Sequence, residues 1–176
     1  MDADRLRQAQ APLKARYKER PDDALVTFRA KGRVSQKDLT CSLESGKPGV
    51  PAGLHPAAGG DGTKACSGDI LLEALVACAG VTLAAVSTSM GIELDEATIT
   101  GEGDADFRGT LGVTKGALVG LSRVRLRFDL QADAPPEKLR KLVELTERYC
   151  LVLQTLAKPP SLEVHIESGG RAPAVT

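Results

Sequence analysis

A chain of 176 residues is long enough to bury one sizeable hydrophobic core, which fits a single domain. Its 23 basic and 23 acidic side chains cancel, so no overall charge attracts it to nucleic acid or to an anionic membrane. Aromatic residues make up only 3% of the chain and Trp is absent, which argues against stacking platforms for single-stranded nucleic acid.

The first 20 residues are polar and of mixed charge, and they predict an amphipathic helix that ends near Pro21. Its apolar side chains recur at helical spacing: Leu6, Ala9, Leu13 and Tyr17. The segment lacks the apolar centre of a signal peptide. We therefore expect a cytoplasmic location, where disulfides are mostly transient and catalytic.

Two β-strands are predicted next, over residues 24–34 and 39–44. The following residues, 45–65, are rich in Gly and Pro and predict a long loop, and such loops in compact domains are often functional. We weigh two roles for His55 in this loop: lining the mouth of a site, or binding a metal together with Cys66. Two ligands do not make a metal site.

Residues 68–90 contain an almost wholly apolar run and predict a helix that is buried on all sides in the core. Ser67 is the expected N-cap and Gly91 the expected C-terminal stop. The run is too short for a membrane span and contains Glu73 near its start. We expect Glu73 to be a buried carboxylate facing the site or a dimer interface, because such a charge needs a partner or a polar cavity.

Two further strands are predicted, at residues 97–107 and 121–131. In the second, apolar residues alternate with Arg123, Arg125 and Arg127, which indicates a half-buried strand with a basic face.

A second long helix is predicted from Pro135–Pro136 to Pro159, with an apolar stripe that runs on as far as Leu156. Residues 162–166 predict a final strand on which His165 points to solvent, and residues 169–176 are expected to be a disordered tail. The order of elements is an α+β pattern with a largely antiparallel sheet, which we take as one domain over residues 1–168.

Four cysteines are far apart in the sequence, and no C-x-x-C pair occurs, so a structural zinc is not expected: Cys41, Cys66, Cys78 and Cys150. Cys78 lies in the middle of the apolar helix, and Cys150 lies on the apolar stripe of the second long helix. Because both helices must bury those faces, we expect them to pack together. The pattern leaves two interpretations open: small hydrophobic core residues, or a functional thiol pair.

Two segments resemble motifs of the OsmC/Ohr family. Asp69–Cys78, with the sequence DILLEALVAC, resembles the start of the family's central helix, where an acidic residue and a short run of leucines precede A-L-x-x-C. Arg148–Val152, with the sequence RYCLV, resembles the family's second cysteine motif near the end of the last long helix. The order of elements also fits the family from about Ala24 to Glu167.

The resemblance implies an OsmC-like fold, with a largely antiparallel sheet wrapped around a buried central helix, in an intertwined homodimer with active sites at the subunit interface. It also implies thiol-dependent reduction of organic (alkyl or lipid) hydroperoxides. Cys78 would be the peroxidatic thiolate and Cys150 the resolving thiol, and an external dithiol would reduce their disulfide. We expect no metal and no bound organic cofactor. We also expect no nucleic acid or membrane as a partner.

Burial raises the pKa of a thiol, so a thiolate in an apolar helix needs a nearby cation. In the Ohr branch, an arginine from the first hairpin supplies this charge, and a glutamate just before the central helix orients it. Arg33 is our best match for that arginine, and Arg29 is the second; the other interpretation is a solvated hairpin charge. The position of the glutamate is occupied here by Gly68.

Asp69 matches an acidic position of the wider family instead. On a regular helix it lies opposite Cys78 and roughly 13 Å along the axis, so it would act through an arginine or serve only as a helix-start carboxylate. The departure at Gly68 motivates an alternative function: an OsmC-fold homodimer that binds an apolar small molecule without peroxidase activity. Cys66 is either an alternative redox partner or a bystander thiol.

Overall fold

The computed structural model describes residues 51–112 and 115–166, the backbone of residues 32–35 and 40–43, and residues 2–5, 8, 10–11 and 19–20. Of the N-terminal residues, 3–5, 8, 10–11 and 19 are helical. The apolar stripe predicted for this segment, the region 24–31 and the predicted tail lie outside the described residues.

A small sheet contains strands β1 (Gly32–Ser35), β2 (Thr40–Leu43), β3 (Ala52–Gly53) and β4 (Ala65–Cys66), in that order. The β1–β2 and β2–β3 pairs are antiparallel, and the β3–β4 pair is parallel. The prediction of an unbroken loop over residues 45–65 is wrong, because this segment includes β3 and a short helix, η2 (Pro56–Ala58), and leads into β4.

A second sheet consists of β5 (Glu96–Ala105) and β6 (Leu121–Gln131), which pair antiparallel as one long ribbon. A short helix, α3 (Phe107–Thr110), lies in the connection between them. Both predicted strands are confirmed, and so is the polar face of the second, where the Arg125 guanidinium bonds Glu102 and Asp104 across the ribbon. The opposite face of β6 packs against the core through Val124, Leu126, Phe128 and Leu130.

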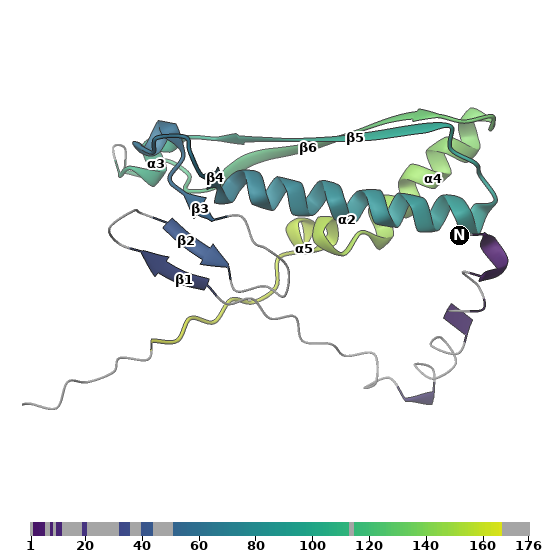
Figure 1. Ribbon diagram of the computed structural model, residues 1–176, viewed down its shortest axis with the longest axis horizontal. Coiled ribbons are helices and arrows are strands. Elements are labelled where there is room, and N and C mark those ends of the chain that lie inside the picture. The colour runs from purple at the N-terminus through teal and green to yellow at the C-terminus, as the bar shows by residue number, and fades with distance from the viewer. Residues whose placement is uncertain are drawn as a thin grey trace, which may run out of the picture.

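Helix α2 (Ser67–Met90) lies along this ribbon over most of its length (Figure 1). Glycines on β5 allow the close approach. A Cβ atom on Gly101 would lie only 2.8 Å from Cγ2 of Val76, and one on Gly103 would lie 3.4 Å from Cδ1 of Leu72. The helix ends as predicted at Gly91, whose φ of 64° is the left-handed conformation that glycine adopts readily. The N-cap, however, is Cys66 and not Ser67.

In the single chain, α2 is buried along one stripe only, formed by Leu75, Ala79, Leu83 and Ser87. Val81, on another face, is 73% exposed. The Glu73 side chain is exposed and is not buried within this chain, and its place at a dimer interface stays a prediction. By length and composition alone α2 could cross a membrane, but core helices of soluble proteins meet the same test, and α2 packs against β5, α4 and α5.

The second long helix is not continuous. Helix α4 (Pro136–Tyr149) begins where it was predicted to begin, but Cys150 has extended backbone angles and α5 (Leu151–Ala157) follows as a separate helix. Just before the break, the buried hydroxyl of Thr146 donates to the carbonyl oxygen of Leu142. Such bonds often bend helices, but Thr82 and Thr88 make the same bond within the unbroken α2, so this bond alone does not explain the break.

The predicted final strand is also wrong for the single chain, because residues 161–166 have no regular secondary structure. Leu162, Val164 and Ile166 are 86–90% exposed. His165 is exposed as predicted, with Nε2 lying 3.6 Å from a carboxylate oxygen of Glu163. An alternating apolar sequence becomes a strand only where another strand pairs with it, and none pairs with this segment among the described residues.

We expect Leu142→Ala to lower the free energy of unfolding by about 2–5 kcal/mol, because this fully buried side chain belongs to the cluster that joins α2 to α4. Urea denaturation followed by circular dichroism measures the change. Val119→Ala is the matched control, because Val119 is 69% exposed, and it should change stability by no more than about 0.5 kcal/mol. Equal losses in the two variants would contradict this assignment of the core.

Candidate thiol site

Cys78 and Cys150, which are 72 residues apart in sequence, meet where α2 contacts the break between α4 and α5. Cys150 is fully buried in a cluster with Leu75 and Ala79, and the half-buried Cys78 packs against that cluster. The Cys150 thiol hydrogen-bonds the Cys78 sulfur. Both thiols are free rather than joined in a disulfide. The two side chains therefore lie in contact with each other.

The two thiols differ in acidity. Burial raises the pKa of Cys78, but hydrogen bonds from the main-chain N–H of Val152, the Cys150 thiol, the main-chain N–H of Leu151 and the Thr82 hydroxyl lower it, and the net shift is downward. For Cys150, burial together with donation to the Cys78 sulfur moves the pKa upward. Cys78 is thus the thiol that ionises first, and Cys150 remains protonated beside it.

The break at Cys150 creates this donor set. Cys150 ends α4 by donating its N–H to the Thr146 carbonyl oxygen at 2.9 Å, and its own carbonyl oxygen accepts from the N–H of Gln154 at 2.9 Å. The first N–H groups of a helix have no partner within it, so those of Leu151 and Val152 are free to point at the Cys78 sulfur. These donors could not be predicted from the sequence, because main-chain groups leave no residue signature.

Thr82 is the other residue that sequence analysis missed. Its Oγ1 donates to the carbonyl oxygen of Cys78 at 2.8 Å, and the same hydroxyl reaches the Cys78 sulfur. Its position four residues after the cysteine on a predicted helix was the available signal, because residues at this spacing lie on the same face.

Of the other predicted site residues, the structure describes the side chains of Asp69 and Cys66, and both lie away from Cys78. Asp69 is exposed in the first turn of α2. Arg33 lies on β1 with its backbone opposite Ser42, and its side chain is outside the described residues. Cys66 caps the start of α2, twelve residues and roughly 18 Å of helix before Cys78, so it is too distant to resolve it.

His55 has a local structural role away from the cysteines. Its Nδ1 accepts the N–H of Ala57 at 3.0 Å and so caps η2, and its ring stacks on Phe107 at 4.8 Å between centroids. Among the described residues, no group of three or more His, Cys, Asp or Glu side chains could hold a metal ion.

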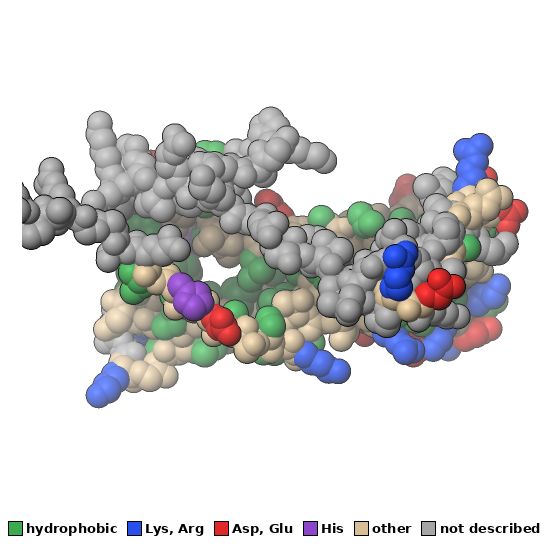
Figure 2. All heavy atoms as spheres, turned by 90° about the horizontal axis from the view of Figure 1, so that it is seen from below, with side chains coloured by type: hydrophobic (Ala, Val, Ile, Leu, Met, Phe, Trp, Pro, Cys, Tyr) green, Lys and Arg blue, Asp and Glu red, His purple; other side chains and the backbone are tan. Residues whose placement is uncertain are grey.

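A cavity of about 650 Å³ lies between α2 and α4, and neither Cys78 nor Cys150 lines it directly. Thr82 forms part of its wall, and so does Tyr149, the neighbour of Cys150. Most of the other lining is apolar: Val81, Ala85, Val86, Met90 and Leu145. Viewed from below, the molecule exposes hydrophobic side chains in the middle of this face, whereas charged ones gather toward the α4 end (Figure 2).

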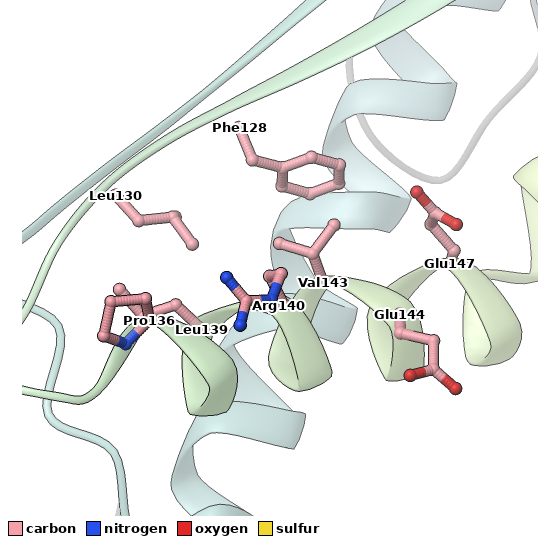
Figure 3. Close-up of a pocket in the computed structure, with 8 residues that line it drawn as sticks. All are labelled: Phe128, Leu130, Pro136, Leu139, Arg140, Val143, Glu144 and Glu147. Atoms are coloured by element: carbon pink, nitrogen blue, oxygen red, sulfur yellow. The ribbon is translucent and has the colours of Figure 1, made fainter.

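A second cavity, of about 520 Å³, lies between β6 and α4 (Figure 3). Phe128 and Leu130 form its β6 wall, while Glu144 on α4 points away from that strand. Among the described residues, no cysteine lines either cavity, but the first is lined by Thr82, which bonds Cys78, and by Tyr149, the sequence neighbour of Cys150.

A family model described as OsmC-like protein matches residues 60–165, which is more than half of the chain. No curated protein sequence matches. Similar solved structures include an OsmC-like protein from Mycoplasma pneumoniae, with 13% identity and a TM-score of 0.65 over 76% of this chain and 89% of that chain. An organic hydroperoxide resistance protein OsmC from Legionella pneumophila has 17% identity and a TM-score of 0.61, over 77% and 92%. The organic hydroperoxide resistance protein OhrB of Bacillus subtilis has 18% identity and a TM-score of 0.53, over 75% and 93%. At these identities the structures share a fold with this chain.

We expect Cys150→Ala to raise the pH midpoint at which Cys78 reacts with iodoacetamide, because the variant removes the thiol that donates to the Cys78 sulfur. Mass spectrometry of the alkylated peptides over a pH series measures the midpoint. Cys150→Ser keeps a donor and should change it less. A midpoint that Cys150→Ala leaves unmoved would show that the two thiols do not interact in solution.

Proposed function

Because this chain belongs to the OsmC-like family, we propose that it reduces organic hydroperoxides, with Cys78 as the attacking thiolate and Cys150 as the resolving thiol. The observation that carries the proposal is the contact between these two side chains, in which the more acidic thiol accepts a hydrogen bond from the less acidic one. Solved structures of the same fold include proteins named for organic hydroperoxide resistance.

The reaction uses the acidity difference between the two thiols in sequence. The Cys78 thiolate attacks the terminal oxygen of the hydroperoxide, the O–O bond breaks, and the alkoxide takes up a proton and leaves as an alcohol. Cys78 is then a sulfenic acid. The sulfur of Cys150, after losing its proton, attacks the Cys78 sulfur and releases water, which leaves a disulfide. An external dithiol reduces the disulfide and restores both thiols, so the cycle needs neither a metal nor a bound cofactor.

The cavity beside Thr82 and Tyr149 supports an organic peroxide as the substrate rather than hydrogen peroxide. Its lining is mostly apolar, so an alkyl or acyl chain placed there would lose contact with water. The same cavity would also suit the alternative function, binding of an apolar small molecule by a protein without peroxidase activity. The state of the thiols after exposure to peroxide separates the two functions.

Arg33 and Asp69 remain proposals for the residues that assist Cys78. An arginine from the β1–β2 hairpin would add a cation to the neutral donors already present around the sulfur, and it would lower the pKa of Cys78 further. Asp69 would act by orienting that arginine, because its place in the first turn of α2 keeps it away from Cys78 itself.

The exposed apolar side of α2 supports a homodimer. Val81 and Leu71 are 73% and 39% exposed on a helix whose buried residues form one stripe only. A second copy lying against this side would also enclose the cavity next to Thr82, which Val81 helps to line. The thiol site would then lie at the subunit interface.

One equivalent of an alkyl hydroperoxide should consume two thiols of the reduced protein and link the peptides that contain Cys78 and Cys150. Thiol titration and mass spectrometry without reductant measure these outcomes. Cys66→Ser should behave as the unmodified protein, because Cys66 is far from the pair, whereas Cys78→Ser should not turn over peroxide. Two free thiols after exposure, with Cys78→Ser as active as the unmodified protein, would overturn the proposed reaction and favour the binding function.

Sedimentation velocity should give twice the chain mass for the unmodified protein and the single-chain mass for Val81→Glu. The variant would bury a charge at the proposed interface, which costs several kcal/mol. Val119→Glu is the matched control, because it places the same charge at an exposed valine in the connection between β5 and β6. A single-chain mass for the unmodified protein, or an unaffected assembly in Val81→Glu, would contradict the proposed interface.

A further inference from the structure

The hydroxyl of Thr82 has two acceptors within reach, and both belong to Cys78. Its Oγ1 lies 2.8 Å from the Cys78 carbonyl oxygen, to which it donates. The same hydroxyl also reaches the Cys78 sulfur. A hydroxyl group carries a single proton and can therefore serve only one of these acceptors at a time. The charge on the sulfur decides which acceptor is better, because hydrogen bonds to ionised groups are about twice as strong as those between neutral groups.

We propose that Thr82 is a positioning residue for Cys78: its hydroxyl donates to the Cys78 carbonyl oxygen while the thiol is protonated and turns to the sulfur when the thiol ionises. This inference rests on the proposed function, in which Cys78 is the attacking thiolate. It extends that function by naming a residue that holds the thiolate in place without adding a charge.

Rotation of the Thr82 hydroxyl from the Cys78 carbonyl oxygen to the sulfur leaves neither acceptor group without a hydrogen bond. In an α-helix the carbonyl oxygen of residue 78 also accepts the main-chain N–H of residue 82, so it keeps a partner when the hydroxyl leaves. The proton moves by rotation about the bond between Cβ and Oγ1 of threonine, which requires no change in the backbone. Thr82 is half-buried, so solvent competes only in part for its hydroxyl.

The other groups around the Cys78 sulfur are apolar or neutral, so the Thr82 hydroxyl competes with no charged side chain among the described residues. Across the sheet, β5 and β6 present apolar side chains to the cluster: Ile99, Val124, Leu126 and Phe128. From the junction of α4 and α5 come the Cys150 thiol, which is titratable, and the main-chain N–H groups of Leu151 and Val152. The acidic residues of α2 that precede Cys78, Asp69 and Glu73, are exposed. The donors described around the sulfur are thus neutral, and Thr82 is the one side-chain hydroxyl among them.

Thr82→Val tests the proposal, because valine keeps the branched shape of threonine and removes the hydroxyl. The readout is the pH dependence of iodoacetamide labelling of Cys78 in the reduced protein, without peroxide. All variants carry Cys66→Ser, since Cys66 and Cys78 fall in the same tryptic peptide: no Lys or Arg lies between residues 65 and 107. Labelling is read from that peptide by mass spectrometry.

In Thr82→Val the midpoint should move to higher pH. Below the midpoint, loss of one charge-assisted hydrogen bond lowers the thiolate fraction about tenfold. The more basic thiolate is also the better nucleophile, and this recovers about half of the effect on a logarithmic scale, so labelling should slow roughly threefold. Thr82→Ser, which restores the hydroxyl, should return the midpoint and the rate to those of the parent protein.

Thr88→Val is the matched control. The Thr88 hydroxyl makes the same type of bond on the same helix, to the Ala84 carbonyl oxygen at 2.8 Å, but it lies six residues further along. If Thr82 were merely structural, both valine variants would change the melting temperature and neither would move the labelling midpoint, and that result would overturn the proposal. If the unmodified protein did not reduce peroxide at all, that result would count against the proposed function. The labelling midpoint would still test the role of Thr82.

Discussion

The break in the second long helix at Cys150 is the constraint on which the thiol site depends. A helix that continued through this residue would engage the N–H groups of Leu151 and Val152 in its own hydrogen bonds. Because α4 ends at Tyr149 and α5 begins at Leu151, these groups have no helical partner and face the Cys78 sulfur instead. The same change of direction brings the buried Cys150 side chain to the helix that contains Cys78. One local departure from helical geometry therefore supplies both the second thiol and the donors for the first.

This arrangement meets the main physical objection to a reactive thiol in an apolar helix. Burial disfavours the thiolate, and it is the largest single influence on the pKa of Cys78. Several neutral donors together outweigh it, so the thiol becomes more acidic without a charged partner among the described residues. Gly68, which replaces the glutamate of the Ohr branch, is then a weaker argument against thiol chemistry than the sequence suggested. An arginine from the hairpin would lower the pKa of Cys78 further, but the neutral donors already lower it without that charge.

Hydrophobic periodicity was a reliable guide to β5, β6, α2 and the start of α4, because each of these elements has apolar residues that the chain itself can bury. It also indicated that the helices of Cys78 and Cys150 face each other. The break at Cys150 could not be predicted, because the apolar stripe continues into α5 at Leu153 and so reads as one helix. The N-cap of α2 was misplaced by one residue, since Cys66 fills that position without a side-chain hydrogen bond.

Two other predictions differ from the structure: the burial of α2 on all sides and the strand at residues 162–166. In both cases the pattern is apolar, but the described part of a single chain does not cover all of it. The sequence of α2 is apolar on all sides, yet one stripe of it is buried here, and residues 162–166 alternate like a strand without a neighbour. Exposing a side chain such as Val81 gives up about 1.5–3 kcal/mol relative to burial, and the final segment exposes three large apolar residues as well. A fold that leaves so much apolar surface in water is stabilised by covering it. The proposed dimer would cover one side of α2, and a core completed by two chains would account for the apolar residues of both segments.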